Sequence, residues 1–343
     1  MKKELTSIEL RFLTKELQNL VNGKIDQIYQ PKETEMLFQI HLPSKGKQLL
    51  YTVLPSFIFL TSEKPEIPLD VTEFCSVLRD RLTNARIRSI QQIQNERILE
   101  ITLEKEKEYL LIIELFSKGN IILCEGKKIL FTLFTQKWKD RTIRPGQEYI
   151  FPEEKCNPFD KKSFDETIHS NKKESLSKIL AVKLGLGKIY AEELCLRTEI
   201  NKLATEINQK EIDTLFDELN KMIIQPVNAR IIYQNKEILD IIPIGMKFYQ
   251  NTEQQRFNTY NEALESALNK MLATSKKTGV ESKFTSHLKQ IETKIAKQKQ
   301  TQEKLEKEAV ENLRKGEMIY ENYQKVKETL TGRKRGEKIK IKL

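Results

Sequence analysis

A succession of short strands, separated at close intervals by turn residues, constrains the fold of this chain more than any other feature. We expect strands at Lys24–Tyr29, Met36–His41, Gln48–Val53, Ile58–Thr61, Arg86–Gln92, Ile98–Glu104, Tyr109–Phe116, Ile121–Cys124 and Lys128–Leu133. Two amphipathic helices are expected among them, Ile8–Leu20, capped by Thr6 or Ser7, and Leu69–Leu82. Many short strands with frequent turn signals are typical of a β-sandwich. The class is therefore α+β, with residues 1–160 forming an N-terminal β-sandwich that has helices packed on its ends.

The chain changes character after Pro152–Lys173, a polar stretch with the composition of a linker. Apolar residues in 174–224 then recur at the spacing of several short helices. Residues 184–193 read as a helix–Gly-x-Gly–helix turn, the pattern of a helix-hairpin-helix. Gly185 and Gly187 can bring backbone N–H groups, at the start of a helix that includes Lys188, close to a phosphate. In the alternative interpretation, the glycines serve helix packing alone.

Strand character returns in residues 226–260, and a long heptad pattern follows. The expected strands are Ala229–Tyr233, Ile238–Ile242 and Lys247–Tyr249, and a helix is expected over Ala263–Ala273. We assign 262–331 to a coiled-coil arm, because mainly apolar seam positions alternate in steps of four and three from Phe284 to Leu330. About 50 such residues make a helix on the order of 75 Å long. A single helix cannot bury this seam, so it requires a partner.

Charge and composition limit the classes of function. The net charge is +10, and six basic residues against one acid lie in a tail, 332–343, which permits an RNA partner or a solubilising terminus. No apolar run approaches the ~20 residues that span a membrane, and we identify no secretory signal. The four cysteines lie far apart, so we expect reduced thiols in the cytoplasm, no structural zinc site and no membrane partner.

No catalytic constellation is evident in the sequence. His41, His169 and His287 are scattered over a strand, a linker and the heptad region. The sequence contains neither a phosphate-binding Gly-x-x-x-x-Gly-Lys-Ser/Thr loop nor a Gly-x-Ser-x-Gly elbow. We therefore expect no enzymatic activity, no cofactor and no metal.

Five short strings resemble the signatures of one family. Glu114–Leu123 reads as strand, turn, strand, and resembles the Glu-Leu-Phe-Gly-Lys/Arg-Gly-Asn-Ile-Ile-Leu string of the NFACT family, the ribosome quality control factors of the NEMF and RqcH type. Those proteins are also known as fibronectin-binding protein A. The other strings are Gly23–Gln30, Phe74–Leu82, Asn84–Ile87 and Ile143–Tyr149. The resemblance covers residues 1–331.

The resemblance carries expectations about fold and function. It implies an N-terminal domain related to that of formamidopyrimidine-type DNA glycosylases, onto which the strands of 226–260 fold back. It implies a non-enzymatic, cytoplasmic factor that binds an obstructed large ribosomal subunit carrying peptidyl-tRNA, with ribosomal and transfer RNA as partners. Recruitment of charged, alanyl tRNA for template-free tailing of the stalled chain is also implied. In the family a return arm and a C-terminal RNA-binding domain follow the long helix, so we expect a fragment or split form whose return arm comes from a missing C-terminal half or a second chain.

The resemblance also points to candidate RNA-binding residues. The segment with Glu96 and Arg97 resembles the family string Asp-Arg-Ile-x-Glu-Ile, whose Asp-Arg pair is implicated in tRNA recognition, and Glu9 corresponds to an aspartate in the first helix. Both aspartates are glutamates here, about 1.3 Å longer, enough to disturb a preorganised contact. The alternative for Arg97 is an ion pair at the start of its strand. Arg79 and Arg86 belong to a basic cluster, either a solvated surface or a contact for RNA phosphates.

Three other functions fit parts of the sequence. A general nucleic-acid-binding module could hold duplex DNA with its helix-hairpin-helix. A fibronectin-binding adhesin follows from the older family name, but we find no signal or anchor to support it. Glycosylase chemistry needs an N-terminal proline, an adjacent glutamate and commonly a zinc finger, whereas this chain has Lys2 and Lys3 and no paired cysteines.

Overall fold

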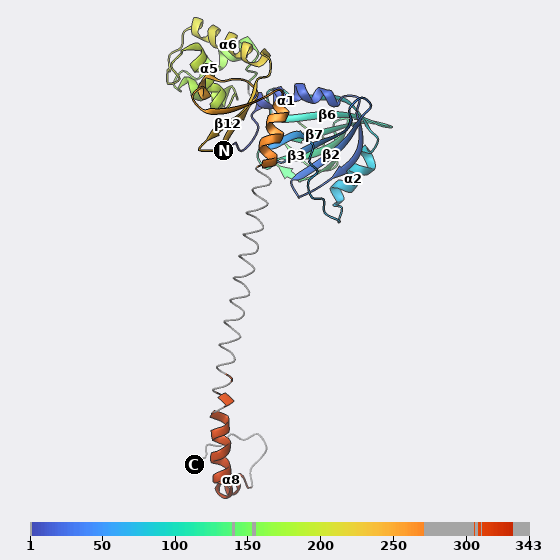
Figure 1. The fold of residues 1–343 in the computed structure, drawn as a ribbon, viewed down its shortest axis with the longest axis vertical. Helices are drawn as coiled ribbons and strands as arrows, with labels where there is room; N and C mark the ends of the chain where they lie inside the picture. Colours follow the sequence, from blue (N-terminus) through green and yellow to red (C-terminus); the bar gives the residue numbers. More distant parts are fainter. Residues whose placement is uncertain are drawn as a thin grey trace. The chain divides into compact units, whose positions relative to one another are not determined.

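The computed structural model describes residues 2–138, 141–152, 156–270, 305, 308–309 and 311–331. They belong to two compact units, 1–270 and 271–343. The first unit is α+β and contains a large antiparallel sheet, as expected from the strand series (Figure 1). The second unit is helical wherever it is described, apart from turns at Asn322 and Thr331.

Nine strands form the large sheet, in the order β4-β3-β2-β1-β5-β6-β7-β8-β9. Their bounds are β1 (Lys24–Tyr29), β2 (Glu35–Leu42), β3 (Gly46–Val53), β4 (Phe57–Thr61), β5 (Arg86–Gln92), β6 (Ile98–Glu104), β7 (Glu108–Glu114), β8 (Asn120–Glu125) and β9 (Lys128–Thr132). Instead of two separate sheets, one continuous sheet has a narrow junction, because β1 and β5 share only the pair Lys24–Arg86. The two halves also approach each other at their turns, where a Cβ on Gly119 would lie 2.8 Å from Cβ of Leu54.

Two helices cover the sheet. Helix α1 (Ser7–Leu17) starts with a capping box between Thr6 and Glu9, buries Phe12 and packs against β5. Helix α2 (Glu73–Leu82) contacts both β1 and β9, the latter through Phe74, whose ring stacks on Phe131 at 6.1 Å. The two helices lie on opposite sides of the sheet in Figure 1. A short turn, η1 (Gln18–Leu20), follows α1, so the helix ends earlier than predicted.

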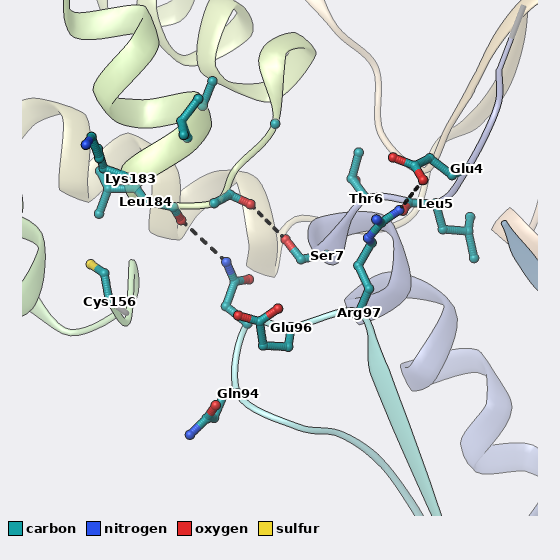
Figure 2. Close-up of a pocket in the computed structure, with 15 residues that line it drawn as sticks. Glu4, Leu5, Thr6, Ser7, Gln94, Glu96, Arg97, Cys156, Lys183 and Leu184 are labelled. Carbon is teal, nitrogen blue, oxygen red and sulfur yellow. Dashed lines mark hydrogen bonds and ion pairs between the residues drawn. The ribbon is translucent and has the colours of Figure 1, made fainter. Parts of the chain in front are cut away.

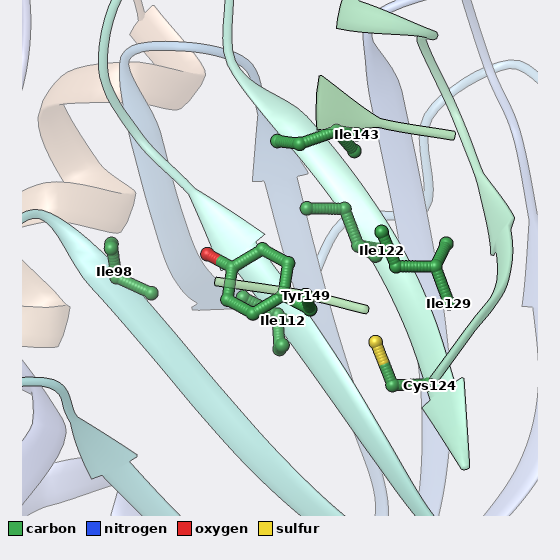
Figure 3. Packing of buried hydrophobic residues seen from close by; sticks show 7 residues of the cluster. All are labelled: Ile98, Ile112, Ile122, Cys124, Ile129, Ile143 and Tyr149. Atoms are coloured by element: carbon green, nitrogen blue, oxygen red, sulfur yellow. The ribbon is translucent and has the colours of Figure 1, made fainter. Parts of the chain in front are cut away.

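The strand–turn–strand segment 114–123 forms the predicted hairpin between β7 and β8. Ser117 and Gly119 take φ values of 56° and 72°, which lets the chain reverse in a short turn. Figure 3 shows the apolar cluster beneath this hairpin, which contains Ile98, Ile112, Ile122, Cys124, Ile129, Ile143 and Tyr149. The cluster joins the sheet to a small two-stranded ribbon, β10 (Gln136–Lys137) and β11 (Thr142–Ile143).

The second part of the first unit is mainly helical. Its elements are α3 (Lys161–Ser170), α4 (Leu176–Lys178), the π-helical turn η2 (Ile179–Lys183), α5 (Lys188–Thr198) and α6 (Gln209–Ile224). The expected linker is thus wrong in part, because Asp160 caps α3 and Phe164 packs against Phe216 of α6 at 5.4 Å. Polar composition concealed this helix, which buries only Phe164 and Ile168.

A three-stranded sheet, in the order β13-β12-β14, follows α6. Its strands are β12 (Ala229–Gln234), β13 (Glu237–Ile242) and β14 (Glu253–Phe257). The strand predicted at 247–249 is wrong, since these residues form a 3₁₀ turn, η3 (Lys247–Tyr249), and the third strand lies later in a polar segment. Residues 260–270 are helical, and the carboxylate of Glu16 accepts the N–H groups of Tyr260 and Asn261 at 2.7 and 2.8 Å. This helix and Asp240 of β13 therefore both contact the N-terminal part of the chain.

The predicted coiled-coil arm lies mostly outside the described residues, as do the tail 332–343 and the predicted seam from Phe284 to Gln302. Residues 311–321 are helical, and α8 (Tyr323–Leu330) follows. The expectation of an unbroken helix is wrong at Asn322, whose φ of −107° and ψ of 30° leave the helical region. The seam residues Leu305, Ile319 and Leu330 are exposed.

Candidate functional site

A cavity of about 350 Å³ opens where three segments distant in the sequence meet (Figure 2). These segments are the residues that start α1, the loop between β5 and β6, and the turn between η2 and α5. The lining residues are Glu4, Leu5, Thr6, Ser7, Gln94, Asn95, Glu96, Arg97, Cys156, Ala181, Val182, Lys183, Leu184, Gly185 and Gly187. The cavity therefore brings together Glu96, Arg97, Gly185 and Gly187, which sequence reasoning had placed in two separate candidate sites.

Hydrogen bonds hold the glycine turn against both other segments. The Ser7 hydroxyl donates to the carbonyl of Gly185 at 3.1 Å, and Asn95 Nδ2 donates to the carbonyl of Leu184 at 3.5 Å. Gly185 and Gly187 have φ values of 66° and 79°, a region that favours glycine over residues with a Cβ. These long-range contacts fix the turn relative to α1.

Helix α5 starts without a side-chain cap, at a residue that lines this cavity. Gly187 is its N-cap residue, and among the described residues no side chain accepts from the first N–H groups of the helix. Such groups carry partial positive charge, which suits an anion. Lys188 is exposed but does not line the cavity, whereas Lys183, which sequence reasoning missed, does.

Arg97 is fixed in position within the cavity wall. Its Nη1 lies 2.7 Å from Glu4 Oε2 and donates to the carbonyl of Leu5 at 3.2 Å, and its side chain is 22% exposed. The sequence left open an ion pair at the start of the strand; the structure has one, with Glu4 as the partner. Figure 2 shows the Glu96 carboxylate as a separate group in the same wall.

Asn95 adds an unused acceptor to the wall. Its Oδ1 is buried and has no hydrogen-bond partner among the described residues. A buried carbonyl without a donor costs free energy, which a ligand hydroxyl, amine or water molecule would recover. The cavity wall thus carries cations at Arg97 and Lys183 and acceptors at Asn95 and Glu96.

Glu9 lies apart from the cavity, in a buried polar cluster. Its carboxylate is 1% exposed, forms an ion pair with Lys2 and accepts a bond from Tyr190 Oη at 3.3 Å. Lys2 Nζ also lies 2.9 Å from Asp240 Oδ1. Burial disfavours the ammonium, but the two carboxylates outweigh it and raise the pKa of Lys2. Burial raises the pKa of Glu9, against the opposing charge of Lys2.

Glu9 nevertheless acts on the cavity through backbone contacts. Its second carboxylate oxygen accepts the N–H of Thr6 at 2.8 Å, and the Thr6 hydroxyl accepts the N–H of Glu9 at 3.2 Å. Thr6 and Ser7 line the cavity, so Glu9 sets the position of its rim. Direct contact with a ligand would require this buried cluster to open.

The two predicted arginines outside this region occupy separate places. Arg79 Nε donates to the carbonyl of Ile28 at 2.7 Å, and its guanidinium lies 5.5 Å from the Tyr29 ring. Arg86 begins β5 opposite Glu104 of β6. Neither residue lines the cavity.

Within the described residues, no helix is both long and apolar enough to cross a bilayer. The same residues contain no group of three His, Cys, Asp or Glu side chains that could hold a metal ion. The four cysteines are free thiols, and Cys156 lines the cavity.

Comparison with known proteins agrees with the motifs. Residues 6–338 match the family described as NFACT N-terminal and middle domains. The archaeal Rqc2 homologue aRqcH of Methanocaldococcus jannaschii is 30% identical over 96% of this chain and 52% of its own length. RqcH of Streptococcus pneumoniae is 36% identical over 54% of this chain and 37% of its own. Ribosome quality control complex subunit 2 of Saccharomyces cerevisiae is 23% identical over 71% of this chain and 24% of its own length.

The fold agrees with that of a solved relative. The fibrinogen binding protein from Staphylococcus aureus superposes with a TM-score of 0.64 at 22% identity, over 76% of this chain and 97% of that one. This likeness establishes the fold alone. The chain spans about half the length of the archaeal relative and less of the other two. Because the family match covers nearly the whole chain, the chain belongs to the NFACT family and is a homologue of Rqc2 and RqcH in their N-terminal and middle domains.

Proposed function

We propose that this chain is a non-enzymatic ribosome quality control factor that acts in the cytoplasm by binding an obstructed large ribosomal subunit with its peptidyl-tRNA. The observation that carries the proposal is the convergence of the Glu96–Arg97 loop and the Gly185–Gly187 turn at one cavity. Both are candidate RNA-binding motifs, and they lie nearly 90 residues apart in the sequence. Membership of a family that includes a ribosome quality control complex subunit supplies the ribosomal partner.

The cavity would hold a short element of tRNA. A phosphate would accept bonds from the uncapped start of α5, with Arg97 and Lys183 supplying positive charge. The Asn95 carbonyl and the Glu96 carboxylate would accept from a base amino group or a ribose hydroxyl. Arg97 is already oriented by Glu4 and Leu5, so little side-chain entropy is lost on binding.

Glu9 would serve as a positioning residue rather than a direct contact. Its carboxylate holds the N–H of Thr6, which lines the cavity, and it is buried against Lys2. The glutamate at this position would therefore act on tRNA through the cavity rim. Arg79 and Arg86 lie outside the cavity, so they would contact other parts of the RNA.

We also propose that the chain recruits charged alanyl tRNA for tailing of the stalled chain. A mixed wall of donors and acceptors suits the recognition of RNA edges as well as phosphate. The exposed seam residues Leu305, Ile319 and Leu330 support a further partner, the return arm of a coiled coil.

Co-sedimentation with purified large subunits tests the proposal. The chain should sediment with subunits at low salt and partly dissociate at moderate salt, because phosphate contacts release counterions. Subunits carrying peptidyl-tRNA should bind more of it than empty subunits. Migration free of subunits under both salt conditions contradicts the proposal. Equal affinity for a DNA duplex and tRNA would favour a general nucleic-acid-binding function instead.

A further inference from the structure

Trp138 is the single tryptophan of the chain, and it is exposed at the end of β10. Its side chain is 38% exposed, although an indole is among the most costly groups to leave in water. Its backbone N–H donates to the carbonyl of Arg141 at 2.8 Å, which continues the β10–β11 ribbon. The ring is therefore accessible to a ligand.

The strand–turn–strand segment anchors the ribbon that carries Trp138. Asn120 is completely buried; its Oδ1 accepts the N–H of Phe134 at 3.1 Å and its Nδ2 donates to the carbonyl of Phe134 at 2.8 Å. Gln136 Nε2 donates to the carbonyl of Gly119 at 3.2 Å. The hairpin of residues 114–123 thus holds the β10–β11 ribbon, which carries Trp138, in place through these hydrogen bonds.

The guanidinium of Arg141 lies over the Trp138 ring. Its Nη1 lies 2.7 Å from the buried carboxylate of Glu114, and its Cζ lies 6.0 Å from the Trp138 ring centroid and 5.6 Å from that of Phe116. Because Glu114 fixes the guanidinium, the cation–π contact restrains the indole before any ligand arrives. A restrained ring loses little entropy when it stacks on a partner.

The charged groups beside the ring favour a polyanion. Lys118 is exposed in the turn between β7 and β8, Lys137 on β10 and Arg144 directly after β11. The carboxylate of Glu114 is already paired with Arg141. Exposed cations beside an ordered aromatic ring are the combination that binds unpaired nucleotides, with the base stacked and the phosphates neutralised.

We propose that Trp138 is a stacking platform for an unpaired RNA base, with Lys118, Lys137 and Arg144 near the flanking phosphates. This subsite deepens the proposed function and rests on it, since it assumes that the chain binds RNA. It is separate from the cavity, because Trp138 and Arg141 do not line it. Together the two sites would contact two different parts of one RNA, or tRNA and ribosomal RNA.

The single tryptophan makes a direct experiment possible. With excitation selective for tryptophan over tyrosine, the emission of the full chain reports Trp138 alone. Stacking with a base should quench this emission. Titration with a single-stranded RNA oligonucleotide should quench the emission, whereas an abasic oligonucleotide with the same number of phosphates should leave it nearly unchanged. Equal quenching by both would overturn the proposal, because it would show that charge alone perturbs the ring.

Variants supply the second measurement, the affinity for fluorescein-labelled RNA by anisotropy. Trp138→Ala should weaken affinity by roughly 5- to 140-fold, the range for losing one base–aromatic stack. Trp138→Phe, which keeps a ring, should recover most of it. Thermal unfolding of each variant shows whether the fold is intact. Undiminished affinity in folded Trp138→Ala would overturn the proposal.

The same measurements separate this inference from the proposed function. Labelled RNA that binds without quenching Trp138 contradicts the platform and leaves RNA binding intact. Absence of any anisotropy change overturns both. If Trp138→Ala weakens co-sedimentation with large subunits while every RNA leaves the fluorescence unchanged, the ring contacts a protein, and the platform for RNA is wrong.

Discussion

The hydroxyl of Ser7 donates a hydrogen bond to the backbone carbonyl of Gly185 at 3.1 Å, and 178 residues separate the two. This bond joins the first turn of α1 to the glycine turn before α5, and the cavity lies between them. A helix that packs on the large sheet therefore sets the position of a turn in the helical part of the chain.

Replacing Gly185 by alanine should destabilise the first unit by about 1–2 kcal/mol, because φ is 66° and a Cβ disfavours this region. The Cβ would meet only Asn95 Nδ2 at 3.5 Å, an ordinary contact, so backbone strain is the dominant cost. Urea unfolding measures it. Gly126→Ala is the matched control, since its φ is 57° with nothing within 4 Å. Only Gly185→Ala should also weaken tRNA binding; equal affinities would contradict the assigned cavity.

Replacing Arg97 by alanine should weaken tRNA binding by roughly 10- to 150-fold, the equivalent of about 1.5–3 kcal/mol for hydrogen bonds to a charged group. The dependence of log affinity on log salt should also become shallower by about 1 if Arg97 contacts a phosphate. Filter binding at several salt concentrations gives both quantities. Arg88→Ala, an exposed arginine paired with Glu104 outside the cavity, should have little effect. Similar losses of tRNA affinity in the two variants would show that binding depends on overall positive charge and not on the position of Arg97.

Removing Lys2 should cost far more stability than neutralising its partner. Lys2→Met leaves Glu9 and Asp240 buried without a cation, which should cost about 3–5 kcal/mol. Glu9→Gln keeps the Lys2–Asp240 pair and an oxygen for the Thr6 N–H, so its cost should stay below about 2 kcal/mol. Urea unfolding at neutral pH compares the variants. Equal losses would show that the cluster is not electrostatically coupled.

The stability difference between the wild type and Glu9→Gln should depend on pH. The pKa of Glu9 is raised above its ordinary value of 4.5 by burial, so the folded state binds this proton more tightly than the unfolded state. Its stabilising contribution is complete below pH 4.5 and is lost as pH rises through the folded pKa. The wild type should therefore lose stability relative to Glu9→Gln over that window. A difference that is constant with pH would contradict the raised pKa.

Cys156 should be the most reactive thiol, and RNA should protect it. It is half-buried in the cavity wall, whereas burial raises the pKa of Cys124 to about 12 and that of Cys195 to about 11. At pH 8 a thiol with a pKa of 11 is only about 0.1% ionised, which makes it slow to alkylate. Mass spectrometry after brief maleimide treatment locates the modified cysteine, with Cys156→Ser as the control. Unchanged labelling in the presence of bound tRNA would place the RNA elsewhere.

Part of the candidate site could be predicted because its motifs are local. Glu96, Arg97, Gly185 and Gly187 lie in short strings whose residue types suit RNA contacts, and all four line the cavity. Sequence reasoning missed Lys183, since nothing in its own segment marks it out. Glu9 was predicted as a contact, but its carboxylate is buried against Lys2, which also pairs with Asp240 of β13. No local pattern in the sequence marks this burial.

The amino-acid sequence by itself determined the family, the strands of the large sheet and the turn at Ser117 and Gly119, because pattern and backbone preference act over a few neighbouring residues. It also indicated α1 through apolar residues at helical spacing and a cap at Thr6 or Ser7, and the structure has Thr6 as the cap. Only the tertiary structure decided that Ser7, Arg97 and Gly185 share one cavity, and that Arg141 supports Trp138. The physical reason is that these contacts join side chains to backbone carbonyls or rings that lie far apart in the chain. Helix and strand periodicity in the sequence reflects only neighbouring residues, so it cannot indicate such contacts.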